Sequence, residues 1–159
     1  MNARTLMLLA AFGSLALIVG AFIFQALGYA PCKLCIWQRW PHGAAIGVGG
    51  LVLIAGPIAL LGLAGALAAL VTAGIGVYHT GVEKKWWEGP SGCTGGGNSL
   101  GGLSGADLLS TDGPTGVVMC DEVAWAFAGL SMASWNALFS LALAALWFKA
   151  VQKRTDETS

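Results

Sequence analysis

Long apolar runs alternate with polar segments along this chain. Four apolar runs cover about residues 6–27, 35–55, 58–82 and 123–148. A helix rises about 1.5 Å per residue, so roughly 20 residues cross the ~30 Å hydrocarbon core of a bilayer, and each run is long enough to do so. The pattern therefore predicts an all-α membrane protein: a single integral membrane domain over residues 1–159, built as a four-transmembrane-helix bundle.

The first three runs also carry turn and packing signals. Gly56-Pro57 predicts a tight turn between the second run and the third. The third run is rich in Leu, Ala and Gly, and small residues let neighbouring helices approach closely in lipid. A cleaved signal peptide is the alternative for the first run, because Arg4 would supply a positive n-region. The run is longer than the ~7–15 residues of a signal h-region, so we expect a retained span.

Composition supports a membrane location and argues against one class of partner. The chain is 56% hydrophobic and 10% charged, whereas an average soluble domain is roughly 25% charged. A soluble domain this apolar would lack the polar residues that cover a surface, so lipid is the expected surrounding. The formal net charge is +0, which provides no basic footprint for nucleic acid, and we expect no such partner.

Two polar segments, about residues 28–34 and 83–122, should lie on one side of the membrane, opposite both termini. The second exceeds the ~12–15 residues of an inert loop, which indicates a functional, extracytoplasmic loop between helices 3 and 4. Disulfides persist in oxidising compartments, so we expect the cysteines outside the cytoplasm and both termini inside it. Basic residues do not decide the orientation, because the two sides tie: Arg4, Lys149, Lys153 and Arg154 against Lys33, Arg39, Lys84 and Lys85.

The four cysteines form two pairs at this boundary. Cys32 and Cys35 make a Cys-x-x-Cys motif at the start of the second run, and Cys93 and Cys120 lie in the long polar segment. Two pairs at one membrane face suggest thiol–disulfide exchange. If the second helix begins near Cys35, its N-terminus should lower the pKa of that thiol. Arg39 lies one turn further on the same face, where a Cys35 thiolate or a polar ligand would satisfy its charge.

Alternative interpretations of these residues stay open. A Cys-x-x-Cys can bind zinc, but Cys93 and Cys120 do not have zinc-ligand spacing, so we expect no metal. Inert structural disulfides are a second alternative, and the longer Cys93–Cys120 loop would be the better staple. His79, near the end of the third run, is either an interhelical hydrogen-bonding group or a proton-transfer group at a bound ligand. His42 carries no signal of its own.

At these motifs the chain resembles the DsbB-type membrane proteins, which reoxidise a periplasmic thiol oxidase. The resemblance covers nearly the whole chain and rests on residues 31–39 (PCKLCIWQR), 78–83 (YHTGVE), 87–93 (WEGPSGC), 120–122 (CDE) and 129–133 (GLSMA). The first block is the most specific, because a Cys-x-x-Cys followed four residues later by an arginine, after one span and at the start of the next, is hard to obtain by chance. The resemblance implies a quinone-dependent protein-disulfide oxidoreductase in the bacterial inner membrane that supports disulfide bond formation.

The resemblance also implies a role for each cysteine. Cys93 and Cys120 would form the disulfide that a reduced thioredoxin-like partner of the DsbA type attacks, with Cys93 in the mixed disulfide. Cys120 would then attack Cys32. Cys35 would leave as a thiolate and pass the electrons to a membrane quinone, either ubiquinone or menaquinone.

Two further residues would lie beside the quinone. The resemblance implies that Arg39 holds a quinone carbonyl and stabilises negative charge on it, and that His79 is a quinone-side histidine. A vitamin K epoxide reductase-like enzyme is disfavoured, because that family carries its quinone-side Cys-x-x-Cys in a late span. A membrane scaffold with structural disulfides and a reductive thiol shuttle remain as alternatives.

Overall fold

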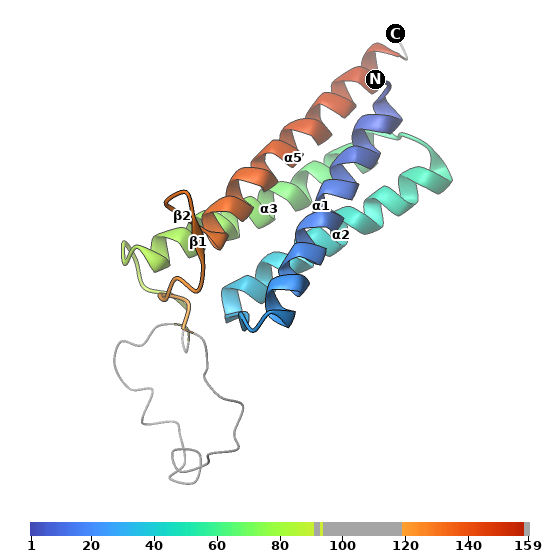
Figure 1. Ribbon diagram of the computed structural model, residues 1–159. Coiled ribbons are helices and arrows are strands. Elements are labelled where there is room, and N and C mark those ends of the chain that lie inside the picture. The colour runs from blue at the N-terminus through green and yellow to red at the C-terminus, as the bar shows by residue number, and fades with distance from the viewer. Residues whose placement is uncertain (91–92, 94–118, 158–159) are drawn as a thin grey trace, which may run out of the picture.

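The computed structural model describes residues 1–90, 93 and 119–157. Four long helices account for most of them: α1 (Ala3–Ala26), α2 (Lys33–Ala55), α3 (Ala59–Glu83) and α5 (Met132–Asp156). Consecutive helices run in opposite directions along a common axis, so the N- and C-termini lie at the same end of the bundle (Figure 1). The helical class expected from the apolar runs is confirmed.

Side-chain and glycine caps explain where the helices start and stop. Asn2 caps α1 by accepting the Thr5 N–H at 2.9 Å, which satisfies one of the free amides of a helix N-terminus. Gly56 ends α2 with a φ of 82°, a left-handed conformation that glycine adopts without steric cost. The turn expected at Gly56-Pro57 is therefore confirmed.

Small residues hold the bundle together. A Cβ built at Gly65 on α3 would overlap the indole of Trp147 on α5, and one built at Gly49 on α2 would overlap Ala11 on α1. Close approach of this kind is how helices associate in lipid, where apolar burial gives little driving force. Large apolar side chains face outward instead, for example Phe12 at 66% exposed. The buried core consists of Leu6, Met7, Ala10, Ala11, Val52, Ala66, Ala69, Leu143, Ala144, Trp147 and Ala150.

Three of the described helices, α1, α3 and α5, are long and apolar enough to cross a membrane. The fourth, α2, has 23 residues, enough length to span. Its first turns carry Gln38, Arg39 and His42, and these polar residues reduce its hydropathy. The expectation that α2 is a fourth span therefore stays a prediction, as do the membrane boundaries themselves.

The last helix does not begin where the apolar run begins. We expected a span over 123–148, but α5 starts at Met132 and a hairpin of β1 (Ala126–Phe127) and β2 (Leu130–Ser131) precedes it. Ala128 and Gly129 both have positive φ, 52° and 79°, the geometry of a two-residue hairpin turn. An apolar run alone does not distinguish such a hairpin from a first helical turn. Most of the expected 83–122 loop lies outside the described residues.

Candidate functional site

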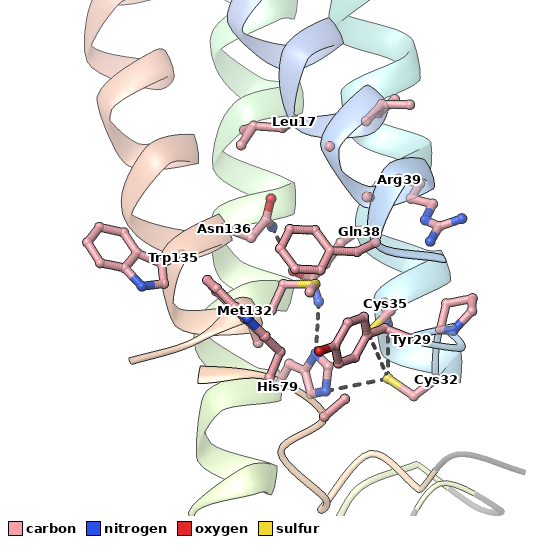
Figure 2. A pocket seen from close by; sticks show the side chains of 18 of the residues that line it. Leu17, Tyr29, Cys32, Cys35, Gln38, Arg39, His79, Met132, Trp135 and Asn136 are labelled. Atoms are coloured by element: carbon pink, nitrogen blue, oxygen red, sulfur yellow. Dashed lines mark hydrogen bonds between the residues drawn. The ribbon is translucent and has the colours of Figure 1, made fainter. Parts of the chain in front are cut away.

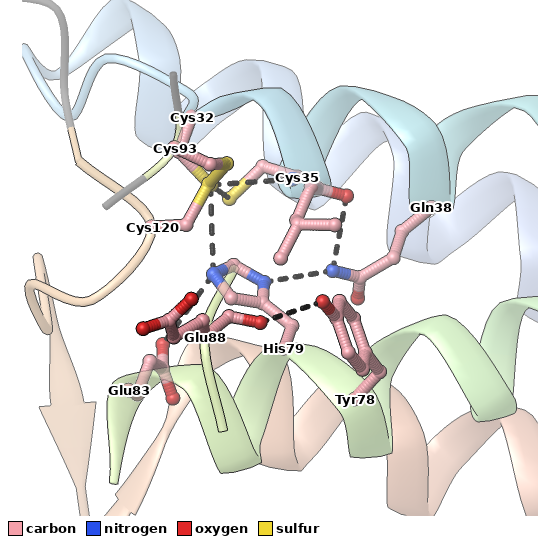
Figure 3. The surroundings of a disulfide bond; sticks show 10 residues. Cys32, Cys35, Gln38, Tyr78, His79, Glu83, Glu88, Cys93 and Cys120 are labelled. Atoms are coloured by element: carbon pink, nitrogen blue, oxygen red, sulfur yellow. Dashed lines mark hydrogen bonds and ion pairs between the residues drawn. A yellow bond between two sulfur atoms is a disulfide. The ribbon is translucent and has the colours of Figure 1, made fainter. Parts of the chain in front are cut away.

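All four cysteines meet at the end of the bundle away from the termini. Cys93 and Cys120 are joined by a disulfide, and Cys32 and Cys35 are free thiols whose sulfurs lie 3.0 Å apart. Cys32, Cys93 and Cys120 are buried in one cluster, with Cys35 packed against it. Figure 3 shows the disulfide directly beside the Cys-x-x-Cys pair. The structure thus places two redox pairs in mutual contact.

Cys32 is the residue at the N-terminus of α2. The helix begins at Lys33, and the Cys32 sulfur accepts the Cys35 N–H at 3.3 Å as its N-cap. We expected the helix to begin near Cys35 and to favour that sulfur, but it begins two residues earlier, at Lys33. Because Pro31 and Cys32 are still extended and the first helical residue is Lys33, the positive end of the helix acts on Cys32.

Its surroundings strongly favour the Cys32 thiolate. Cys32 precedes α2 and lies in the polar loop expected over residues 28–34, outside the expected membrane spans. The hydrogen bond from the Cys35 thiol is the largest influence, and contacts with His79 add to it. Together they outweigh burial and lower the pKa of Cys32 from 9.0 to about 4. A thiolate is both a nucleophile and a good leaving group in disulfide exchange, so this sulfur is prepared for exchange chemistry.

His79 connects the cysteine pair to the helix interior. It is only 3% exposed; its Nε2 lies 3.5 Å from the Cys32 sulfur and its Nδ1 lies 2.9 Å from Nε2 of Gln38. Glu83, one turn along α3, places a carboxylate oxygen 3.9 Å from His79 Nε2 and accepts a hydrogen bond from Ser131. The interhelical hydrogen bond expected of His79 is therefore present. Its role in proton transfer stays a prediction.

A cavity opens beside this cluster between the helices. Its volume is about 410 Å³, within the range of about 300–1,000 Å³ typical of small-molecule sites. Figure 2 shows aromatic and aliphatic side chains around it, with Cys35, Gln38 and Arg39 on one wall. Most of the wall area is apolar, which suits a flat, lipophilic ligand. The polar lining residues are Tyr29, Cys32, Cys35, Gln38, Arg39, His42, His79, Glu83, Glu122 and Asn136.

Arg39 lies on the cavity wall, and α1 supplies its partners. Its Nη1 donates to Gln25 Oε1 at 2.9 Å, and its guanidinium carbon lies 4.7 Å from the ring centre of Phe22. Its Nε is buried and has no hydrogen-bond partner among the described residues. The expected pairing with a Cys35 thiolate is not seen among the described contacts of Arg39, and binding of a polar ligand by Arg39 stays a prediction.

The same cluster offers ligands to a soft metal ion. The Cys32, Cys35 and His79 donor atoms all lie within 4.8 Å of one another. A structural zinc site ordinarily has four protein ligands, so three leave this set one short. The expectation of a metal-free site stays a prediction.

The structure adds polar residues that we did not identify from the sequence. Gln38 and His42 are buried on α2 and bond to Asn136 on α5, with Gln38 Oε1 at 2.6 Å from Asn136 Nδ2 and His42 Nε2 at 3.0 Å from Asn136 Oδ1. A signal was available: polar residues four apart in an apolar run share one helix face. Buried polar groups within membrane helices mark functional positions by default.

Comparison with known proteins agrees with this arrangement. A family model described as "Disulfide bond formation protein DsbB" matches residues 3–150. The chain belongs to the DsbB family. Relatives named "Disulfide bond formation protein B" include one from Xanthomonas oryzae pv. oryzae, 33% identical over 87% of this chain and 82% of its own length. Another, from Xylella fastidiosa, is 33% identical over 80% of this chain and 79% of its own length. No solved structure matched the chain.

Membership of the DsbB family gives the cluster its general chemistry. The chain is a membrane protein of disulfide bond formation and a disulfide oxidoreductase. The two cysteine pairs and the apolar helices α1, α3 and α5 agree with both statements.

Proposed function

We propose that this protein is a thiol:quinone oxidoreductase of the bacterial inner membrane. It reoxidises a periplasmic thioredoxin-like dithiol oxidase of the DsbA type and passes the electrons to membrane quinone. The observation that carries the proposal is the contact between an intact Cys93–Cys120 disulfide and a Cys-x-x-Cys dithiol that lines an apolar cavity. In this proposal one pair receives electrons from a protein, and the other releases them to a lipophilic acceptor.

Exchange with the partner begins at the Cys93–Cys120 disulfide. A partner thiolate attacks the Cys93 sulfur, forms a mixed disulfide and releases Cys120 as a thiolate. The second partner thiol then attacks the mixed disulfide and releases Cys93, so the partner gains a disulfide. Two electrons and two protons have moved from the partner dithiol to the pair at Cys93 and Cys120.

Internal exchange then moves the electrons to the Cys-x-x-Cys pair. Cys120 attacks Cys32 of an oxidised Cys32–Cys35 disulfide and releases Cys35. Cys93 next attacks Cys120, which restores the Cys93–Cys120 disulfide and releases Cys32. Thiols of low pKa leave faster, so the pKa of Cys32, lowered to about 4, favours this last step. The structure has the covalent arrangement that follows it: one disulfide and two free thiols.

The cavity has the properties that a quinone requires. Its walls are mostly apolar, Cys35 reaches it, and the buried Arg39 Nε is a donor without a partner among the described residues. When bound, a quinone supplies an acceptor for two electrons and two protons, the amount released when two thiols close one disulfide. Arg39 would hold a ring oxygen and stabilise negative charge there. His79 Nε2 would hold a proton next to the Cys32 sulfur.

The shape of the bundle supports the proposed orientation. Both termini lie at one end and the cysteines at the other (Figure 1), as expected when α2 is a fourth span. We place the termini in the cytoplasm and the cysteines in the periplasm, because disulfides persist in the oxidising compartment.

Quinone reduction by the purified protein tests the proposal. Given a reduced thioredoxin-like dithiol and a short-chain ubiquinone, the protein should produce quinol and oxidised partner in equal amounts. Cys35→Ser should abolish quinol formation, whereas Leu60→Ala, at an exposed position on α3, should not. Undiminished turnover by Cys35→Ser would refute the mechanism. If the unmodified protein shows neither exchange nor quinol formation, a membrane scaffold with structural disulfides is favoured, whereas exchange without quinol formation favours a thiol shuttle.

A further inference from the structure

A continuous set of hydrogen bonds joins the cysteine cluster to His42. It runs from Cys32 through His79 and Gln38 to Asn136, whose Oδ1 lies 3.0 Å from His42 Nε2. Figure 2 shows the middle of this network, from Asn136 past Gln38 to His79. Its members come from α2, α3 and α5, so it fixes side chains on three walls of the cavity relative to one another.

The direction of these bonds is set by a backbone carbonyl. Gln38 Nε2 lies 3.2 Å from the Leu34 carbonyl oxygen, which can only accept, so this end of the amide is the donor. Its second N–H therefore points to His79 Nδ1, which must accept. The neutral His79 ring then carries its proton on Nε2, facing the Cys32 sulfur.

The orientation of the Gln38 amide also sets the direction of the bonds that lead to His42. Gln38 Oε1 accepts from Asn136 Nδ2, so Asn136 presents its oxygen to His42 Nε2. His42 must donate through Nε2, and the neutral ring leaves a bare lone pair on Nδ1. A doubly protonated ring would add a buried charge and a second N–H with no acceptor among the described residues, which burial disfavours.

His42 Nδ1 is therefore a hydrogen-bond acceptor without a partner. His42 is 3% exposed and lines the cavity, and its Nδ1 is buried with no hydrogen-bond partner among the described residues. Arg39, three residues earlier on α2, also lines this cavity, and its buried Nε is a donor without a partner among the described residues. Residues three apart lie on one helix face. Two residues that line the cavity thus carry one donor and one acceptor without partners among the described residues.

We propose that His42 is a second acceptor-binding residue and that it makes the cavity select the reduced, hydroxyl-bearing form of the quinone. This inference rests on the proposed function. A quinone has only carbonyl acceptors, so it can satisfy Arg39 Nε but meets a lone pair at His42 Nδ1. A hydroquinone hydroxyl donates to His42 Nδ1, and a ring oxygen accepts from Arg39. The reduced product is held more tightly than the oxidised substrate, which favours electron transfer out of the dithiol.

Binding of the two redox forms tests this proposal without turnover. In a Cys32→Ser/Cys35→Ser background, calorimetry would give the Kd of a short-chain ubiquinone and of its hydroquinone. His42→Leu should reduce the preference for hydroquinone about tenfold, or ~1.4 kcal/mol. His42→Gln, which can donate to Asn136 and still present an oxygen, should keep most of it. The dimethyl ether of the hydroquinone, which has no hydroxyl donor, should bind the parent and His42→Leu proteins equally.

Nitrogen NMR of the histidine rings gives an independent readout. In the unmodified protein, His42 should show an unprotonated Nδ1 and a protonated Nε2. An equal affinity ratio in the parent and His42→Leu proteins, or the opposite tautomer, would overturn the inference and leave the proposed function intact. Failure of both redox forms to bind the parent protein would instead overturn the proposed quinone site. If His42→Leu alone fails to fold, the affinity ratio of the His42→Gln variant and the tautomer of the His42 ring test the inference instead.

Discussion

The thiolate at Cys32 gives the sharpest quantitative prediction. Its pKa is lowered from 9.0 to about 4, and the hydrogen bond from the Cys35 thiol is the largest cause. A thiol of pKa 9 is only about 1% ionised at pH 7, whereas one of pKa 4 is almost fully ionised. Cys35→Ala removes the main donor and should raise the pKa of Cys32 the most. His79→Phe removes a smaller contribution and should raise it less.

The sign of the pH effect follows from linkage. Because the folded pKa lies below the unfolded value, the ionised thiolate stabilises the folded, reduced protein fully above pH ~9. That contribution declines as the pH falls and is lost once the pH passes the folded pKa of about 4. A stabilised reduced form also makes the Cys32–Cys35 disulfide more oxidising, which is the direction required for accepting electrons.

Ultraviolet absorbance of the thiolate is the appropriate assay. In a Cys93→Ala/Cys120→Ala background, reduced protein contains only the thiols of Cys32 and Cys35. One thiolate should already be present at pH 7 and should disappear with a midpoint near pH 4. A midpoint close to that of an ordinary thiol would refute the reasoning. So would a pKa unaffected by Cys35→Ala, since the proposed main donor would then contribute nothing.

Three further substitutions test the cavity, the packing and the hydrogen-bond network. Arg39→Met should reduce kcat/KM for quinone roughly 10- to 100-fold, the ~1.5–3 kcal/mol of a charge-assisted hydrogen bond, and steady-state kinetics should show Arg39→Lys recovering part of the loss. Gly65→Leu should destabilise the bundle by ~1–3 kcal/mol through overpacking, whereas Gly74→Ala, at a position with open space, should leave the Tm in detergent unchanged or higher. Gln38→Leu removes the donor to His79 Nδ1, so nitrogen NMR should detect a loss of the single Nε2–H tautomer.

The sequence predicted the helices better than their ends. Runs of about 20 apolar residues required helices on physical grounds, because backbone groups in lipid must be satisfied within the segment. The start of α2 was missed by two residues because Cys32 acts as a side-chain cap, and a thiol is not among the common N-cap residues. The start of α5 was missed because the turn at Ala128-Gly129 is formed within an apolar stretch.

Contacts between distant segments were beyond sequence reasoning alone. The positions of Cys93 and Cys120 in one polar segment suggested a pair, but four cysteines allow three pairings, and their redox roles entered only through the resemblance to DsbB-type proteins. That Arg39 turns to Gln25 and Phe22 on α1 depends on how two helices pack. No periodicity within one segment contains that information.

The polar residues that line the cavity from α2 nevertheless share one face of that helix, and their spacing can be read from the sequence. Cys35, Gln38, Arg39 and His42 occupy positions i, i+3, i+4 and i+7 of α2, and all four line the cavity. This is the spacing of a stripe that faces the interior of a bundle, here occupied by a thiol, an amide, a guanidinium and an imidazole. The stripe reduces the hydropathy of α2 below that of its neighbours. We infer that the weakest membrane signal among the four helices comes from the same residues that build the acceptor site.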